Sequence, residues 1–178
     1  MKSCATDTRT LRRTGESQYA RAVQKDLNDL KSADKDLNAI ITKLEEPGKV
    51  HTISMVASPD EKTTYGNGCN LNSEKDAATK GVGTGSSINY NPWNKSAGDP
   101  SIPEKRADRP AKIGLAHELG HSWNAHRGTA NFGKTSNGVS FFEVQAVDVE
   151  NIARAAYGVK ERSIYNGISI RNYLPRRQ

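Results

Sequence analysis

The chain has 178 residues, of which 34% are hydrophobic and 26% are charged, and it carries a net charge of +6 at pH 7. This length suits one domain with a real hydrophobic core, while no apolar run approaches the roughly 18 to 20 residues of a membrane span, which excludes a membrane-spanning helix. Residues 1–15 are basic and have no apolar core, so we expect no standard secretory signal peptide, and either a cytosolic protein or export by a specialised system.

Residues 17–46 have the pattern of one long amphipathic helix. The apolar positions recur every seven residues with others between them, and they are Val23, Leu27, Leu30, Leu37, Ile41 and Leu44. Asp34 interrupts the second row, and Pro47 and Gly48 end the helix. Because the apolar seam is short, we favour a helix that packs on the core over a clamp or a pairing surface. We divide the chain into an N-terminal segment, 1–48, and a domain, 49–178.

Two short strands are predicted in the next part of the chain. Residues 50–57 are rich in β-branched side chains, and residues 87–91 form a second candidate strand. Between them, residues 58–86 are dominated by Gly, Asn, Ser, Thr and Lys, and their glycine spacing matches neither a Walker loop nor a dinucleotide-binding loop. We therefore predict a flexible surface loop there. Residues 93–109 form another polar loop, which either borders a substrate cleft or only joins two elements.

Residues 111–124 are predicted to form a helix that carries His117, Glu118 and His121. Two histidines four positions apart lie on one helix face, so both imidazoles can reach one metal ion. Glu118 sits one step around the helix, where it can contact a metal-bound water. A zinc ion lowers the pKa of such a water to about 7, and the carboxylate takes its proton as it attacks a carbonyl. The alternative is a polar helix face that happens to carry two histidines.

Particular residues mark the two ends of this helix, and a glycine lies in its interior. Asp108 and Pro110 resemble a helix start, and Asn124 or Gly128 can end the helix in the left-handed conformation. Gly120 costs about 1 kcal/mol relative to alanine in a helix interior. Either another backbone passes close to this turn, or the glycine is merely tolerated.

A catalytic zinc site needs a third protein ligand beside two histidines. His126 is one candidate, but it lies nine residues after His117, and the extended three-histidine pattern needs a histidine ten residues after it. We therefore expect His126 to be an exposed polar residue near the end of the helix.

Residues 141–157 are predicted to form a second helix whose acids are better candidates. Glu143 and Glu150 share one helix face, so one can ligate zinc while the other supports a histidine. Asp148 points away from that face and is expected to be solvated. Glu143 is our first choice for the third ligand, and the alternative for each acid is an ordinary surface charge.

A hydrogen-bond donor is expected near the metal, because negative charge builds on the carbonyl oxygen during attack. Tyr157, Arg162 and Tyr165 follow the second helix closely in sequence. All three are candidates on their position alone.

Basic residues gather in the ranges 9–13, 105–109 and 171–177, which raises nucleic-acid binding as an alternative function. Aromatic residues make up only 6% of the chain and do not interleave with these runs, as a stacking platform requires. A solvated basic surface is therefore the favoured interpretation.

Cys4 and Cys69 are the only cysteines, and their spacing fits no zinc or redox motif. We favour two free thiols in a reducing compartment over a bridge between them.

An ordered set of residues extends beyond the histidine motif. A glycine-rich approach to a strand comes first, and the set continues with Tyr90, Asn91, Pro92, Arg109, Pro110, the histidine motif, Asn124 to Gly128, Glu143, Glu150, Asn151, Arg154, Arg162 and Tyr165. Over residues 83–165 this set resembles the NleD-like family of bacterial effector and toxin zinc metallopeptidases. Many peptidases share the histidine motif, and the downstream residues make the resemblance more specific. The chain departs from the family pattern at Phe142, where a second acid is expected beside Glu143.

The resemblance implies an α+β, zincin-like fold with a small β-sheet and a metal-binding active-site helix, to which the long N-terminal amphipathic helix is added. It implies a zinc-dependent metalloendopeptidase that a specialised bacterial system secretes and that cleaves proteins inside a target cell. An immunity or secretion partner is compatible with that role. The implied site consists of the zinc ligands His117, His121 and Glu143, the general base Glu118, and the supporting residues Arg162 and Tyr165. The main alternative is a zinc-binding interaction module without catalytic activity.

Overall fold

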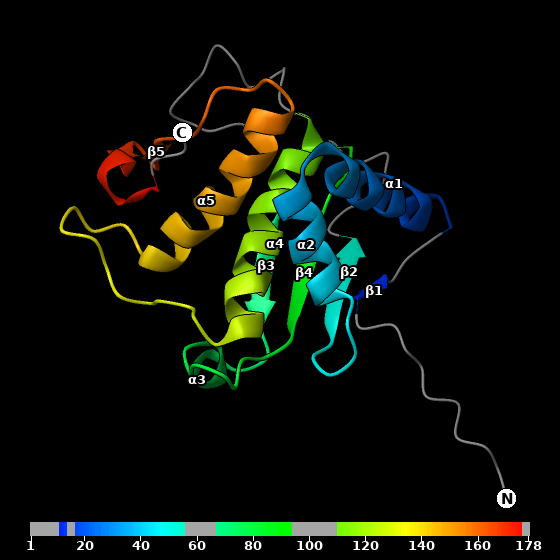
Figure 1. The fold of residues 1–178 in the computed structure, drawn as a ribbon, viewed down its shortest axis with the longest axis horizontal. Helices are drawn as coiled ribbons and strands as arrows, with labels where there is room; N and C mark the ends of the chain where they lie inside the picture. The colour runs from blue at the N-terminus through cyan, green and yellow to red at the C-terminus, as the bar shows by residue number, and fades with distance from the viewer. Residues whose placement is uncertain (1–10, 14–16, 56–66, 94–109, 176–178) are drawn as a thin grey trace, which may run out of the picture.

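The computed structural model describes residues 11–13, 17–55, 67–93 and 110–175. Over these ranges the fold is α+β, with two small sheets and a set of helices (Figure 1). The helices are α1 (Ser17–Ala33), α2 (Lys35–Leu44), α3 (Glu74–Ala77), α4 (Ala111–Arg127), α5 (Phe141–Ala156) and the 3₁₀ helix η2 (Arg171–Tyr173). The strands are β1 (Leu11–Arg13), β2 (His51–Met55), β3 (Gly68–Leu71), β4 (Ser86–Tyr90), β5 (Ile164–Tyr165) and β6 (Ile168–Ser169). No helix in the described ranges is both long enough and apolar enough to cross a membrane.

The larger sheet has the strand order β1-β2-β4-β3. β1, β2 and β4 run parallel, whereas β3 runs antiparallel to β4 and forms one edge of the sheet. Ile53 pairs with Ile88 in the centre, and both side chains are fully buried. The two strands predicted from composition are confirmed as β2 and β4. The prediction of a loop over residues 58–86 is wrong in part, because this range contains β3 and α3; its residues 58–66 lie outside the described ranges.

The N-terminal helical region is two helices, so the prediction of one long helix is wrong. Asp34 has extended backbone angles (φ −154°, ψ 142°), and its side chain accepts hydrogen bonds from the backbone N–H groups of Asp36 and Leu37 at 2.7 and 3.2 Å. An aspartate in this position caps a new helix by satisfying N–H groups that have no partner within it. The interruption seen in the apolar pattern is therefore the boundary between α1 and α2.

α1, α2 and α4 share one hydrophobic core with the sheet. Its fully buried members come from both sides of the expected boundary at residue 48, and they include Leu30, Ile41, Leu44, Ile53, Ile88, Ile113 and Leu115. Two hydrogen bonds add to this packing: Tyr19 donates to the Tyr90 carbonyl oxygen at 3.2 Å, and Tyr90 donates to the Asp26 carboxylate at 2.7 Å. α1 and α2 are thus core-facing helices, as favoured from the sequence.

α4 lies in the middle of the molecule, with α5 along one side and α1 and α2 along the other (Figure 1). α5 approaches closely at Gly120, where a Cβ atom would lie 2.9 Å from the Cα atom of Ala146. Of the two alternatives for Gly120, the close approach of another backbone is therefore the one that the structure supports. α4 ends at Gly128, whose φ of 70° is left-handed, and Pro110 occupies its N-cap; Asp108 lies outside the described residues.

Candidate metal centre

α4 and α5 bring together the three residues predicted as metal ligands. His117 and His121 lie one turn apart on α4, and Glu143 lies in the first turn of α5. One oxygen of Glu143 is 3.2 Å from His117 Nε2 and 3.4 Å from His121 Nε2. One potential ligand atom from each of the three residues lies within 4.8 Å of the others, so a single ion can contact all three.

The chemistry of this group fits a divalent cation. Two imidazole nitrogens and one carboxylate oxygen are a ligand set that zinc takes in catalytic sites. Burial opposes ionisation of Glu143, but hydrogen bonds to His117 and His121 outweigh burial and hold its pKa well below the usual range. Burial lowers the pKa of His117, but hydrogen bonds to Glu143 and Glu150 raise it to about 9 overall. The same negative surroundings that favour a proton on His117 favour a metal ion beside it.

Glu150 supports His117 from the other side of its ring. The Glu150 side chain is fully buried and accepts hydrogen bonds from His117 Nδ1 at 3.0 Å, Arg154 Nε at 2.8 Å and Arg162 Nη1 at 3.1 Å. When His117 is neutral, the proton on Nδ1 is donated to this carboxylate, and Nε2 is left with the lone pair that can bind a metal ion. Glu150, which the sequence left as an alternative third ligand, is thus placed to orient His117.

Hydrogen bonds of Asn151 and Arg162 hold the segment after α5 close to Glu150. The Asn151 side chain donates to the Arg162 carbonyl oxygen at 2.9 Å and accepts from the Arg162 N–H at 2.7 Å. Arg162 is buried, and its Nε donates to the carbonyl oxygen of Ile164 at 3.1 Å. Its guanidinium therefore has hydrogen-bond partners on Glu150 and on the β5 backbone, and these fix its position beside Glu150.

Tyr165 lies against His117 and beside Arg162. Its ring is stacked on the His117 ring with centroids 6.3 Å apart, and the Arg162 guanidinium carbon lies 4.7 Å from the centre of the tyrosine ring. Burial raises the pKa of Tyr165, and the Glu143 carboxylate raises it further. The phenol therefore keeps its proton at neutral pH and can donate a hydrogen bond beside the metal position.

Glu118 is buried next to the same group. Its charge acts on the pKa values of His117 and Tyr165, which places its carboxylate near both rings. It also contributes to raising the pKa of Cys69 to about 11, chiefly a consequence of burial. The Glu118 carboxylate on α4 is therefore close enough to Cys69 of the edge strand β3 for its charge to act on the thiol. Cys69 has no disulfide partner in the described ranges, and Cys4 lies outside them.

His126 is neither a ligand nor the exposed residue that we expected. It is buried, and its Nδ1 lies 3.0 Å from His51 Nε2. The chain of contacts continues from His51 Nδ1 to the Ser86 hydroxyl at 2.8 Å and from there to the Ser122 hydroxyl at 2.7 Å. Sequence reasoning missed this network, because each contacting pair is separated by 35 residues or more and no spacing rule connects the two partners.

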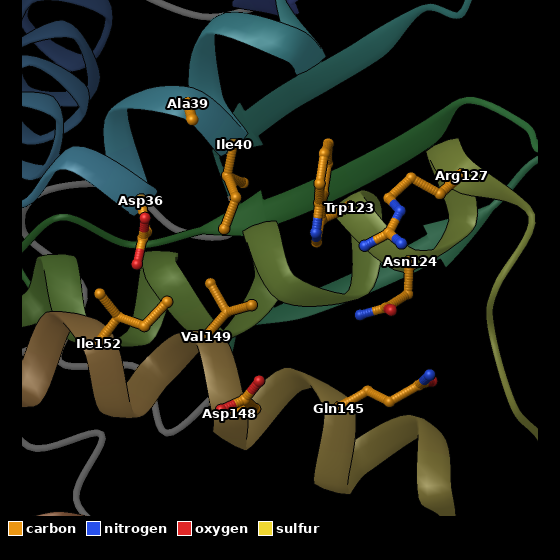
Figure 2. Close-up of a pocket in the computed structure, with 10 residues that line it drawn as sticks. All are labelled: Asp36, Ala39, Ile40, Trp123, Asn124, Arg127, Gln145, Asp148, Val149 and Ile152. Atoms are coloured by element: carbon orange, nitrogen blue, oxygen red, sulfur yellow. The ribbon is translucent and has the colours of Figure 1, made fainter. Parts of the chain in front are cut away.

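Asp148 and Tyr157 also lie away from the metal group. Asp148 lines a groove of about 530 Å³ between α2, α4 and α5, together with Ile40 and Trp123 (Figure 2). No residue of the metal group borders this groove. Tyr157 lies beside Lys112, whose Nζ is 5.0 Å from the tyrosine ring centre. Neither residue is placed to act at the candidate metal centre.

Phe142 replaces the expected acid and packs on the second histidine. Its ring centroid lies 4.1 Å from that of His121. Nδ1 of His121 is buried and has no hydrogen-bond partner in the described part of the chain. His121 is thus held by an aromatic contact, in contrast to His117, which is held by a carboxylate.

A comparison with protein families gives one result. A family model named Peptidase_M91, described as effector protein, matches residues 7–162. No curated protein and no solved structure matches the chain. The match includes α4, α5 and every residue of the candidate centre except Tyr165, and it covers most of the chain. The chain therefore belongs to this bacterial peptidase family of effector proteins.

Proposed function

We propose that the protein is a zinc-dependent metalloendopeptidase with a zincin-like, NleD-like catalytic domain. The observation that carries this proposal is the Glu143 oxygen at 3.2 and 3.4 Å from the facing nitrogens of two histidines on one helix. The buried Glu118 beside them supplies a base, and the peptidase family supports the reaction class. The NleD-like assignment is supported by the convergence of Glu150, Asn151, Arg154, Arg162 and Tyr165 behind one ligand.

The side chains divide the catalytic work as follows. Zinc held by His117, His121 and Glu143 would lower the pKa of a water molecule and polarise the peptide carbonyl. Glu118 takes a proton from the attacking water and later gives it to the amine nitrogen of the leaving peptide. Tyr165 donates a hydrogen bond to the carbonyl oxygen as negative charge develops there. Arg162 keeps Tyr165 in place.

We infer that the substrate is a protein of a target cell and that a specialised bacterial system exports the enzyme. The support is the family of effector proteins to which the chain belongs. An immunity or secretion partner is compatible with the same role. The basic runs that suggested nucleic-acid binding lie largely outside the described residues.

The replacement Glu118→Gln separates an enzyme from an inert zinc-binding module. It keeps the size of the side chain and removes the base, so we expect full zinc content together with the loss of peptide hydrolysis by a factor of at least about 10². The measurement is cleavage of a mixed peptide library by zinc-loaded protein, with Glu161→Gln as a surface control. Cleavage by Glu118→Gln at the wild-type rate would contradict the mechanism, and zinc binding without cleavage by the wild type would favour the inert module.

A further inference from the structure

An exposed phenylalanine stands close to the metal centre. Among the described residues, the large hydrophobic side chains that are exposed are Val50, Val82, Phe132 and Ile168, with exposed fractions between 37% and 49%. Phe132 is the aromatic one, and exposing so large an apolar ring to water is unfavourable in free energy. A single exposed apolar residue is ordinary, so its neighbours decide whether it has a role.

Phe132 is the outer member of a row of rings that ends at a metal ligand. Its centroid lies 5.1 Å from that of Phe142, which in turn lies 4.1 Å from that of His121. Behind this row, Phe142 packs with Leu71 of β3 against a cluster formed by Ala77, Ala125 and Ala130. The two phenylalanines therefore form a continuous apolar wall, Phe132 and Phe142, which starts at His121.

The backbone on both sides of Phe132 is fixed, so its exposure does not come from a loose loop. The Asn131 N–H donates to the Gln145 side chain at 3.0 Å, and the Phe141 N–H donates to the Gly133 carbonyl oxygen at 2.8 Å. The Gln145 amide also donates to the carbonyl oxygen of Thr129 at 2.9 Å. The loop is thereby attached to α5, which holds the Phe132 ring beside Phe142.

We propose that this wall is a specificity subsite that accepts a large apolar side chain of the substrate next to the scissile bond. The inference rests on the proposed function, since it needs the bond to be cut at His117, His121 and Glu143. An extended peptide advances by about 3.3 Å per residue, so two rings in succession cover the reach of one or two residues beside that bond. Contact with an aromatic or long aliphatic side chain would remove the exposed Phe132 surface from water.

Phe142 gives the subsite its chemical character. An acidic side chain beside His121 would favour a polar or basic substrate residue. With phenylalanine there, the wall carries no charge of its own. The structure therefore assigns an apolar preference to this particular chain.

The test is the cleavage profile of a mixed peptide library with the zinc-loaded full chain, read by mass spectrometry. We expect wild-type cleavage sites to be enriched in large apolar residues at one position next to the cut bond. Phe132→Ser should lower kcat/KM for those peptides about three- to tenfold, with unchanged zinc content and unchanged rates for peptides with small residues there. Phe132→Glu should shift the preference at that position towards lysine and arginine. The matched controls are Val82→Ser and Val82→Glu, because Val82 is exposed to 49% but lies outside the aromatic row.

The possible results separate this inference from the proposed function. If peptides are cleaved without an apolar preference, or if both Phe132 variants keep the wild-type profile, the subsite is wrong and the peptidase stands. If zinc-loaded wild type cleaves no peptide at all, the proposed function fails and the subsite fails with it.

Discussion

At the scale of single residues, Glu150 determines how His117 can act. This buried carboxylate accepts from three donors, and its bond to Nδ1 favours the neutral tautomer of His117 that leaves Nε2 free for a metal. The two arginines in turn depend on Glu150, because both are buried and need an acceptor. The Glu150 carboxylate thus affects both the orientation of His117 and the stability of the fold.

Glu150→Gln should weaken zinc binding and folding together. We expect a zinc affinity about 10- to 100-fold lower and an unfolding free energy lower by on the order of 3 kcal/mol, because Arg154 and Arg162 lose their charged partner. Chelator competition measures the first quantity and urea unfolding the second. Glu161→Gln, on the exposed surface, is the control. Wild-type zinc affinity in Glu150→Gln would show that the carboxylate does not orient His117.

Gly120 is the residue on which the approach of α4 and α5 depends. In Gly120→Ala the new Cβ would meet backbone atoms of Ala146 at 2.9 and 3.1 Å, and backbone cannot move aside as a side chain can. We expect a loss of about 1 to 3 kcal/mol in unfolding free energy despite the better helix propensity of alanine. Zinc affinity should fall as well, since Glu143 moves away with α5. Gly68→Ala, where no atom lies within 4 Å, is the matched control. An unchanged or increased stability of Gly120→Ala would contradict this packing.

At the scale of elements, the network of His51, His126, Ser86 and Ser122 joins β2 and β4 to α4. Burial and, to a smaller extent, the neighbouring His126 together lower the pKa of His51 to about 4. The unfolded chain binds the proton at an ordinary pKa of about 6.5. Between these two values the unfolded state holds more protons than the folded state, so stability is lost as the pH falls.

We therefore predict that the unfolding free energy decreases from pH 6.5 towards pH 4, by on the order of 3 kcal/mol for His51 alone. Urea unfolding at several pH values tests this. His51→Gln should be less stable at pH 7.5 but should show a shallower pH dependence over that window. If the variant and the wild type have the same slope, His51 is not the group responsible.

The sequence predicts some of these helices and strands but not others. α4 and α5 follow from helical periodicity. The spacing of Glu143 and Glu150 on one helix face predicts that one of them can ligate a metal while the other supports a histidine. β3 is short and polar, and its pairing with β4 depends on partners distant in sequence, so local patterns could not find it. The cap at Asp34 could have been recognised, because aspartate prefers that position, but the seven-residue periodicity outweighed it. No sequence pattern indicates the contact of His51 with His126.

At the scale of the whole molecule, the N-terminal segment and the rest of the chain share one core. Leu27, Leu30 and Ile41 are almost fully buried in the same cluster as Leu115 and Leu119. The division of the chain at residue 48 stays a prediction. Because the two segments share a core, we expect them to fold together. The family match, which begins at residue 7, also spans both.

A protein shortened to residues 49–178 should accordingly not fold. Its core would lose the large apolar side chains of α1 and α2 and would expose α4 to water. Circular dichroism with thermal unfolding, compared with the full chain at equal concentration, tests this. A shortened protein with a cooperative transition and bound zinc would show that 49–178 is an independent domain.

The proposed function requires that His117, His121 and Glu143 hold one zinc ion between α4 and α5. The most direct measurement is the zinc content per chain of purified wild type, His121→Ala and Glu143→Ala, after dialysis against a weak chelator, with Glu161→Ala as control. We predict about one zinc ion per chain for wild type and control and little or none for the other two variants. Full zinc retention by Glu143→Ala would show that Glu143 is not a zinc ligand.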